Sequence, residues 1–208
     1  MKYIIKAGNM IISTLIGGFL PLLLFLLFLT ISQIFKNEKI ISILSFSGFF
    51  IGLIMNLIFI YKWIKYPYKI NNIVLIIIYI FYSIFIFGIF MAVPVFNILM
   101  GIIAGLFTGI KLRYFNLDKI NKLNAINNIS YFSVIVLFVL CIISAYFALA
   151  SSSTQNDLKG MLNLNFEVTR NMILGLIIIG GLILLFIQYW ITKFTAIIIS
   201  EYKNSENM

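Results

Sequence analysis

Residues 97–109 read NILMGIIAGLFTG, an uncharged stretch in which Asn97, Gly101, Gly105 and Gly109 recur at every fourth position. Residues four apart lie on one face of an α-helix. In water such a face would form only a weak helix, because glycine costs about 1 kcal/mol relative to alanine. In lipid, small residues at this spacing let a second helix backbone approach closely. The stretch therefore predicts a buried transmembrane helix against which other helices pack.

The composition of the whole chain supports the same interpretation. The 208 residues are 62% hydrophobic and only 10% charged, with a mean hydropathy of +1.11. Soluble domains carry about a quarter charged residues. The apolar runs are long enough for helices that cross a hydrocarbon layer of about 30 Å, and the short alternating segments of a barrel are absent from them. We predict an all-α integral membrane protein with a single transmembrane domain, residues 1–208.

The apolar runs predict six spans, at approximately residues 10–35, 40–61, 70–91, 95–110, 129–150 and 171–191. Pro21 interrupts the first run, and proline favours a kink because it removes a backbone donor. Such a kink is tolerated in lipid where neighbouring groups pair with the freed carbonyl.

Basic residues predict the orientation, because Lys and Arg concentrate in the cytoplasmic loops of membrane proteins. With the amino terminus inside, eleven basic residues fall on the inner side and four on the outer side, the four being Lys36, Lys39, Lys159 and Arg170. We therefore expect both termini in the cytoplasm, most naturally at the plasma membrane. The net charge of +9 is explained by contact with anionic lipid headgroups, without a nucleic acid partner.

Three connecting segments carry further expectations. Residues 116–127 have an apolar residue at every third position and predict either a short helix on the membrane surface or an ordinary loop. Between residues 151 and 170, Thr154 and Asp157 resemble a helix-capping pair, and the alternation in 162–169 allows a small hairpin or an extended segment. Trp63, Tyr66 and Tyr68 lie among three lysines, a mixture typical of a membrane–water interface. We expect residues 193–202 to continue the last helix.

Missing residue types exclude several kinds of chemistry. The chain has no histidine, which removes imidazole catalysis and histidine metal ligation. None of its six acidic residues falls inside a predicted span, whereas ion-coupled carriers usually place a carboxylate there. The lone Cys141 is interpreted as a small apolar filler. We expect no enzymatic activity, no cofactor and no metal.

The polar groups within the spans are amides and hydroxyls. Candidate ligand-binding residues, for a small polar cavity, are Tyr79, Tyr82, Ser83, Asn56, Asn97 and Gln188. The alternative is that these groups only hydrogen-bond between helices, which contributes well under 2 kcal/mol each.

Two sets of glycines predict helix packing. Gly48 and Gly52 fall at a depth similar to that of Gly101 and Gly105, so we predict that the second and fourth spans pack glycine against glycine. The alternative is that each glycine face meets a different helix.

Two classes of function agree with these observations. The first is a small transport component, a substrate-binding or permease subunit for an uncharged or weakly polar solute. The second is a non-transporting accessory or assembly protein that docks a partner membrane protein through its glycine-rich faces. A chain of this size could also act as a homo-oligomer. A solvent-reachable cavity lined by Tyr79, Tyr82, Asn56 or Asn97 favours the first class, and a close-packed bundle favours the second.

Overall fold

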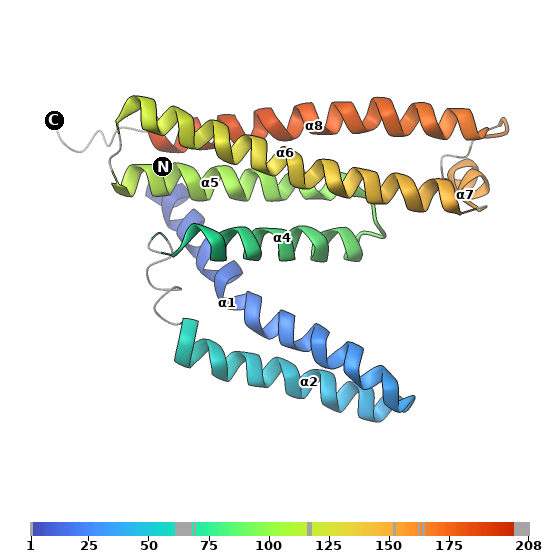
Figure 1. Ribbon diagram of the computed structural model, residues 1–208, viewed down its shortest axis with the longest axis horizontal. Helices are drawn as coiled ribbons and strands as arrows, with labels where there is room; N and C mark the ends of the chain where they lie inside the picture. Colours follow the sequence, from blue (N-terminus) through green and yellow to red (C-terminus); the bar gives the residue numbers. More distant parts are fainter. Residues whose placement is uncertain are drawn as a thin grey trace. The chain divides into compact units, whose positions relative to one another are not determined.

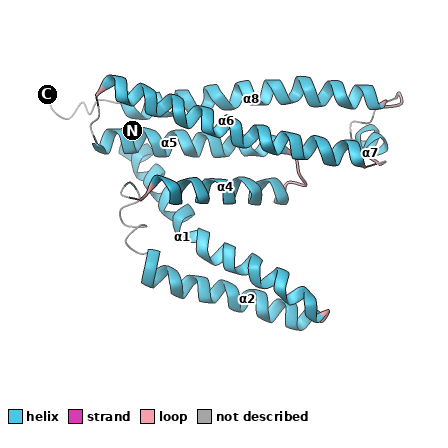
Figure 2. Ribbon diagram, viewed as in Figure 1, coloured by secondary structure: helices cyan, strands magenta, loops and turns pink. Residues whose placement is uncertain are grey.

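The computed structural model describes residues 2–60, 68, 70–115, 118–151, 153–161, 163 and 165–201. Regular structure in these residues is entirely helical (Figure 2). The α-helices are α1 (Lys2–Ser32), α2 (Glu38–Met55), α4 (Asn72–Ile89), α5 (Ile98–Phe115), α6 (Lys119–Ala150), α7 (Thr154–Met161) and α8 (Arg170–Glu201) (Figure 1). In the part of the chain that the structure describes, six helical segments are long and apolar enough to cross a membrane, which is the predicted number.

The chain forms two compact units, residues 1–78 and 79–208. Unit 1 contains α1, α2 and the first residues of α4, and unit 2 contains the rest of α4 together with α5 to α8. The single transmembrane domain expected from the sequence stays a prediction.

In unit 1, α1 and α2 form an antiparallel hairpin built around glycine contacts. The backbone of Gly48 lies against Leu24 and Phe28 of α1, and Gly52 lies against Pro21. A Cβ atom at Gly52 would stand 2.5 Å from the Cα of Pro21, closer than two carbons can approach. The glycines of α2 therefore serve close contact with α1.

Pro21 lies inside α1 and cannot donate a hydrogen bond to the carbonyl of Gly17, four residues earlier. The side chain of Asn56, at the start of a short π-helical turn after α2 (Asn56–Ile60), donates its Nδ2 proton to this carbonyl. The condition under which lipid tolerates a proline in a helix, a neighbouring group that pairs with the freed carbonyl, is therefore met at Gly17. Asn56 is itself buried, so the bond forms in an apolar setting.

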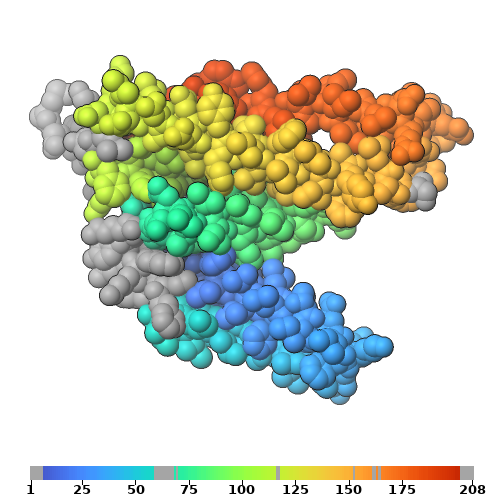
Figure 3. Space-filling model, in the orientation of Figure 1, coloured from blue at the N-terminus to red at the C-terminus, as the bar shows by residue number. Residues whose placement is uncertain are grey.

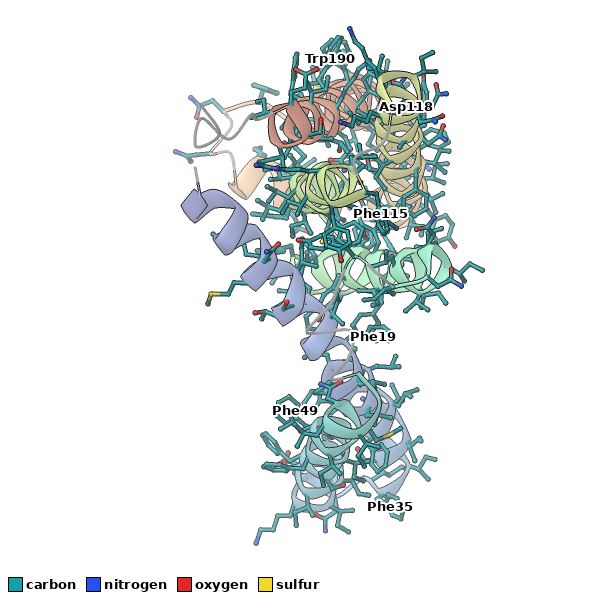
Figure 4. The ribbon with its side chains drawn as sticks, turned by 90° about the vertical axis from the view of Figure 1, so that its left-hand side faces the viewer. Phe19, Phe35, Phe49, Phe115, Asp118 and Trp190 are labelled. Carbon is teal, nitrogen blue, oxygen red and sulfur yellow. The ribbon has the colours of Figure 1, made fainter. Side chains whose placement is uncertain are left out.

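In unit 2, α5 lies in the middle, bordered by α8 and α6, as Figure 4 shows by looking along these helices. Gly101 faces Gln188 and Thr192, and Gly109 faces Ala196 and Ile199 further along α8. Residue numbers thus rise together, so α5 and α8 run parallel. The α6 helix runs the opposite way, because Ser133 contacts Thr192 while the earlier residue Ile126 packs in a cluster with Ala196 and Leu112.

These contacts decide between the two predicted packing arrangements. The glycines of α2 contact α1, whereas Gly101, Gly105 and Gly109 of α5 contact α8. The glycine-on-glycine pairing of the second and fourth spans is wrong, and the alternative, in which each face meets a different helix, is confirmed. Periodicity identifies the packed face of a helix but carries no information about its partner.

The segment before the fifth span also differs from expectation. Residues 119–127 are neither a separate surface helix nor a loop, because α6 runs without interruption from Lys119 to Ala150. Asp118 has an extended backbone and precedes the first helical residue. No glycine or proline occurs between residues 119 and 150, so nothing in the sequence ends the helix between its polar and apolar parts. Residues 116 and 117 lie outside the described part.

The connection between α6 and α8 contains one short helix. Ser153, rather than Thr154, precedes α7, and its hydroxyl donates to the carboxylate of Asp157 at 2.9 Å. Residues 163 and 165–169 carry no strand, so the hairpin is not present in the described residues. The last helix continues to Glu201, as predicted, and Tyr202 lies outside the described part, as do Trp63 and Tyr66.

Candidate functional site: a buried polar centre in unit 2

Six polar side chains from four helical segments are buried in the interior of unit 2, and we call them the polar centre. They are Tyr79 and Ser83 of α4, Asn97 of the 3-10 turn Pro94–Asn97 just before α5, Ser133 of α6, and Gln188 and Thr192 of α8. Each is at most 9% exposed, and Ser133, Gln188 and Thr192 are 0% exposed. None of these side chain types carries a charge at neutral pH. The polar centre is therefore buried and uncharged.

Contacts between helices involve four of the six residues, and Ser83 contacts Tyr79 within α4. The Oγ of Ser133 and the Oγ1 of Thr192 lie 3.0 Å apart. The Tyr79 hydroxyl lies next to the side chains of Ser83 and Gln188, and the Tyr79 ring packs against Phe132 of α6, with ring centroids 5.2 Å apart. Ser133 also donates to the carbonyl of Ser130, 2.9 Å away. The polar centre thus links α4, α6 and α8.

Gly101 of α5 makes room for the side chains of α8 in this centre. A Cβ atom at position 101 would stand 2.7 Å from Nε2 of Gln188 and 2.8 Å from Oγ1 of Thr192. Asn97 precedes Gly101 by one helical turn, on the same face. The absence of a side chain at Gly101 therefore allows the Gln188 amide to lie against the α5 backbone, beside the turn that carries Asn97.

Several polar atoms of the centre have no hydrogen-bond partner of normal geometry. These atoms are Oε1 and Nε2 of Gln188, Oδ1 and Nδ2 of Asn97, and Oγ of Ser83. A buried polar group without a partner costs about 1–3 kcal/mol, and most such groups in proteins are paired. Two carboxamides in one centre therefore lack hydrogen-bond partners of normal geometry, although the Tyr79 hydroxyl lies next to that of Gln188.

The structure places the predicted candidates in two locations. Tyr79, Ser83 and Gln188 lie together, and Asn97 lies one turn from the glycine that faces Gln188. Tyr82 is buried in the same helix as Tyr79. Asn56 belongs to unit 1, where its Nδ2 is used by Gly17.

The sequence reasoning missed Ser133 and Thr192. Thr192 follows Gln188 by four residues and shares its helix face, a signal that was available in the sequence. Ser133 carried no comparable signal, because hydroxyls recur along α6 at Ser130 and Ser144 as well. Only the contact between Ser133 and Thr192 distinguishes it.

Comparisons with protein family models, with curated proteins and with solved structures found no match to this chain. The function is therefore argued from the polar centre itself.

Proposed function

We propose that the chain is an integral membrane protein of six crossings, with both termini in the cytoplasm of the cell that makes it and its basic loops against anionic headgroups of the plasma membrane. The helices α5, α6 and α8 are the fourth, fifth and sixth spans. A chain that crosses a membrane back and forth must have its fourth and sixth spans parallel and its fifth span antiparallel to both. The parallel course of α5 and α8, with α6 antiparallel to both, supports the proposal. Lys111, Arg113, Lys119 and Lys122 follow one another at the same end of α5 and α6, which agrees with an inner surface there.

Within this setting, we propose that the chain is a transport component that binds a small uncharged polar solute at the polar centre. The observation that carries the proposal is the pair of buried carboxamides, Asn97 and Gln188, whose four polar atoms have no hydrogen-bond partner of normal geometry, although the Tyr79 hydroxyl lies next to Gln188. Each carboxamide offers one acceptor oxygen and two donor protons. A solute with its own donors and acceptors would satisfy these atoms, and the polar centre would replace part of its hydration.

The chemistry of the polar centre selects against charged solutes. Moving an ion out of water into an apolar interior is very costly unless a counter-charge accompanies it, and the six residues of the polar centre supply none. Hydroxyls and amides pair with neutral groups instead. The proposal includes no catalytic step, because the polar centre holds no general base or activated nucleophile of the usual kinds.

The accessory class of function receives less support from the glycine contacts. Gly48, Gly52, Gly101, Gly105 and Gly109 were the expected docking faces. All five lie against helices of the chain itself. A partner docked through these faces would have to displace α1 from α2 or α8 from α5.

The experiment measures solute flux into proteoliposomes that contain the purified protein. Stopped-flow light scattering follows swelling after addition of urea, acetamide or glycerol as probes. We expect at least one probe to enter faster than into protein-free liposomes, and Gln188→Leu to lower this excess about tenfold, the effect of roughly 1.4 kcal/mol. Gln155→Leu, at an exposed position of α7, is the matched control and should retain the excess. Wild-type flux equal to that of protein-free liposomes for all three probes would overturn the proposal.

A further inference from the structure

The turn between α4 and α5, residues 90–97, lies far from the end of the hairpin that α6 and α8 form. Gly101 faces α8 between Gln188 and Thr192. Because the two helices are parallel, Pro94 lies at about the level of Ile183. Arg170, the first residue of α8, is thirteen positions further, or about 20 Å along the helix axis at 1.5 Å per residue. Figure 3 shows α6 and α8 extending well beyond α4, which is coloured green, and Figure 1 shows the turn set back from α7.

Helix lengths give the same result independently. The α6 and α8 helices have 32 residues each, or about 48 Å, whereas α4 and α5 have 18 residues each, or about 27 Å. The hydrocarbon core of a bilayer is about 30 Å thick. The two pairs of helices therefore cannot end at the same two membrane surfaces.

The part of the α6–α8 hairpin beyond the turn is apolar on its outside. Its large exposed side chains are Ile142, Ile143, Tyr146, Phe147, Met172, Leu174, Leu176, Ile178, Ile179 and Leu182. If the turn lay at the water surface, this apolar surface would extend about 20 Å into water. Contiguous apolar patches of that size are rare on surfaces in contact with water. If hydrocarbon instead surrounds this part of the hairpin, the membrane surface lies near the end of the hairpin. The turn, which is set back from that end, then lies inside the hydrocarbon layer.

The turn itself has the chemistry of a segment surrounded by lipid. No charged residue occurs from Ile70 to Ile110. Met91 is 90% exposed, and the side chains of Val93 and Val95 are also exposed. The rings of Phe90 and Phe96 stack with their centroids 3.8 Å apart and join the two sides of the turn. Everything that the turn presents outward is apolar.

The amide donors at the start of the turn are paired within the chain, as hydrocarbon requires of polar backbone groups. The amides of residues 90, 91, 92 and 93 donate to the carbonyls of Ile86, Gly88, Phe87 and Phe90, and Pro94 has no amide proton. Met91 and Ala92 have positive φ angles of 53° and 62°, which L-residues rarely adopt. This strained pair reverses the chain while all four amides remain paired.

We propose that the α4–α5 turn ends inside the hydrocarbon layer and that lipid acyl chains, rather than water or a protein partner, cover residues 90–96. The proposal rests on the membrane insertion of the proposed function. It changes the proposed six crossings in one respect, because α4 and α5 then form a hairpin that turns about 20 Å from the level of Arg170 and does not reach the outer surface.

Cysteine accessibility in intact cells tests the proposal. The variants are Met91→Cys and Val95→Cys, with Gln155→Cys of α7 as the exposed control, all in a Cys141→Ser background. The probe is a charged maleimide that cannot cross membranes, applied outside intact cells and, separately, to both sides after permeabilisation. Maleimides react with the thiolate, which does not form in hydrocarbon. Val95 has an ordinary backbone conformation, so it keeps the test valid if substitution of Met91 disturbs the strained pair.

We expect Gln155→Cys to react from outside, and Met91→Cys and Val95→Cys to react from neither side until detergent unfolds the protein. Reaction of both turn variants at a rate similar to that of Gln155→Cys would overturn the inference. Reaction of Gln155→Cys only after permeabilisation would overturn the proposed orientation alone, and protection of the turn from both sides would still support a turn within the lipid. Reaction of all three variants in a water-soluble fraction would overturn membrane insertion itself.

Discussion

Asn56→Ala removes the donor that pairs with the Gly17 carbonyl, and the effect on stability should depend on residue 21. With Pro21 present, no backbone amide replaces the lost bond, because proline has none, and a buried carbonyl remains unpaired. Leaving such a group without a partner costs about 1–3 kcal/mol, and measured hydrogen bonds between membrane helices reach at most about 1.7 kcal/mol. We expect Asn56→Ala to lower the free energy of unfolding by about 1–2 kcal/mol.

Pro21→Ala supplies an amide at position 21 that can donate to Gly17 in the ordinary helical pattern. In that background, Asn56→Ala should cost about 1 kcal/mol less than in the wild type, because the carbonyl keeps a partner. The cost of the smaller side chain at position 56 is present in both backgrounds and cancels in the double-mutant cycle. The coupling energy thus isolates the hydrogen bond.

The assay is reversible unfolding of the four proteins in mixed micelles as the fraction of denaturing detergent rises. Ser45→Ala is the matched control, because Ser45 is buried on the same helix but bonds to the carbonyl of Ile41 in its own helix. Its cost should be the same in the wild type and in the Pro21→Ala background. If Asn56→Ala costs the same in both backgrounds, the pairing of Asn56 with the carbonyl freed by Pro21 contributes nothing, and the stabilising role that we assign to this hydrogen bond is refuted.

Two further predictions concern glycine packing and pH. Gly105→Ala should destabilise the fold by about 1–3 kcal/mol, because the new Cβ would stand 2.6 Å from the carbonyl oxygen of Thr192. Gly180→Ala should instead stabilise α8 by up to about 1 kcal/mol, because a Cβ at position 180 would meet no atom within 4 Å. Detergent unfolding of both variants checks this difference. Tyr68 lies outside the apolar helices, is buried and donates to Oδ1 of Asn9, and burial raises its pKa from 10.0 to about 12. Because the fold favours only the protonated hydroxyl, the contribution of Tyr68 to the free energy of unfolding is complete below pH 10 and disappears as the pH rises towards 12. The stability of Tyr68→Phe should therefore vary less with pH over this window. If the dependence of stability on pH is the same in Tyr68→Phe and the wild type, the assignment is contradicted.

The number of helices could be predicted because length and apolarity alone determine which segments can cross hydrocarbon. The beginning of α6 could not, because Lys119, Lys122 and their polar neighbours resemble a loop in composition. The deciding property was the absence of any residue that ends a helix between this polar part and the apolar part that follows. Composition indicates which segment lies in water, whereas helix continuity depends on breakers and caps.

The polar centre was predictable in part for a similar reason. Tyr79, Ser83, Asn97 and Gln188 stood out as polar residues within apolar runs. Their grouping depends on which helices are neighbours, and one sequence without a packing partner does not contain that information. Asn56 shows the consequence: it has the same type of side chain and a similar setting, yet it pairs with Gly17 in unit 1.

The glycine stripe of α5 shows why one periodic pattern can have two physical roles. The atoms nearest to Gly105 and Gly109 include backbone carbonyls of α8, so at these positions glycine brings two helix backbones together. The atoms nearest to Gly101 are instead the amide of Gln188 and the hydroxyl of Thr192. At this position glycine gives space to polar side chains. A Cβ atom added at Gly101 would displace the Gln188 amide, which is the end of a flexible side chain. A Cβ atom added at Gly105 would instead clash with the rigid backbone of α8. The same spacing therefore brings α5 close to the α8 backbone at Gly105 and Gly109 and leaves room for polar side chains at Gly101, near the turn that we place in lipid.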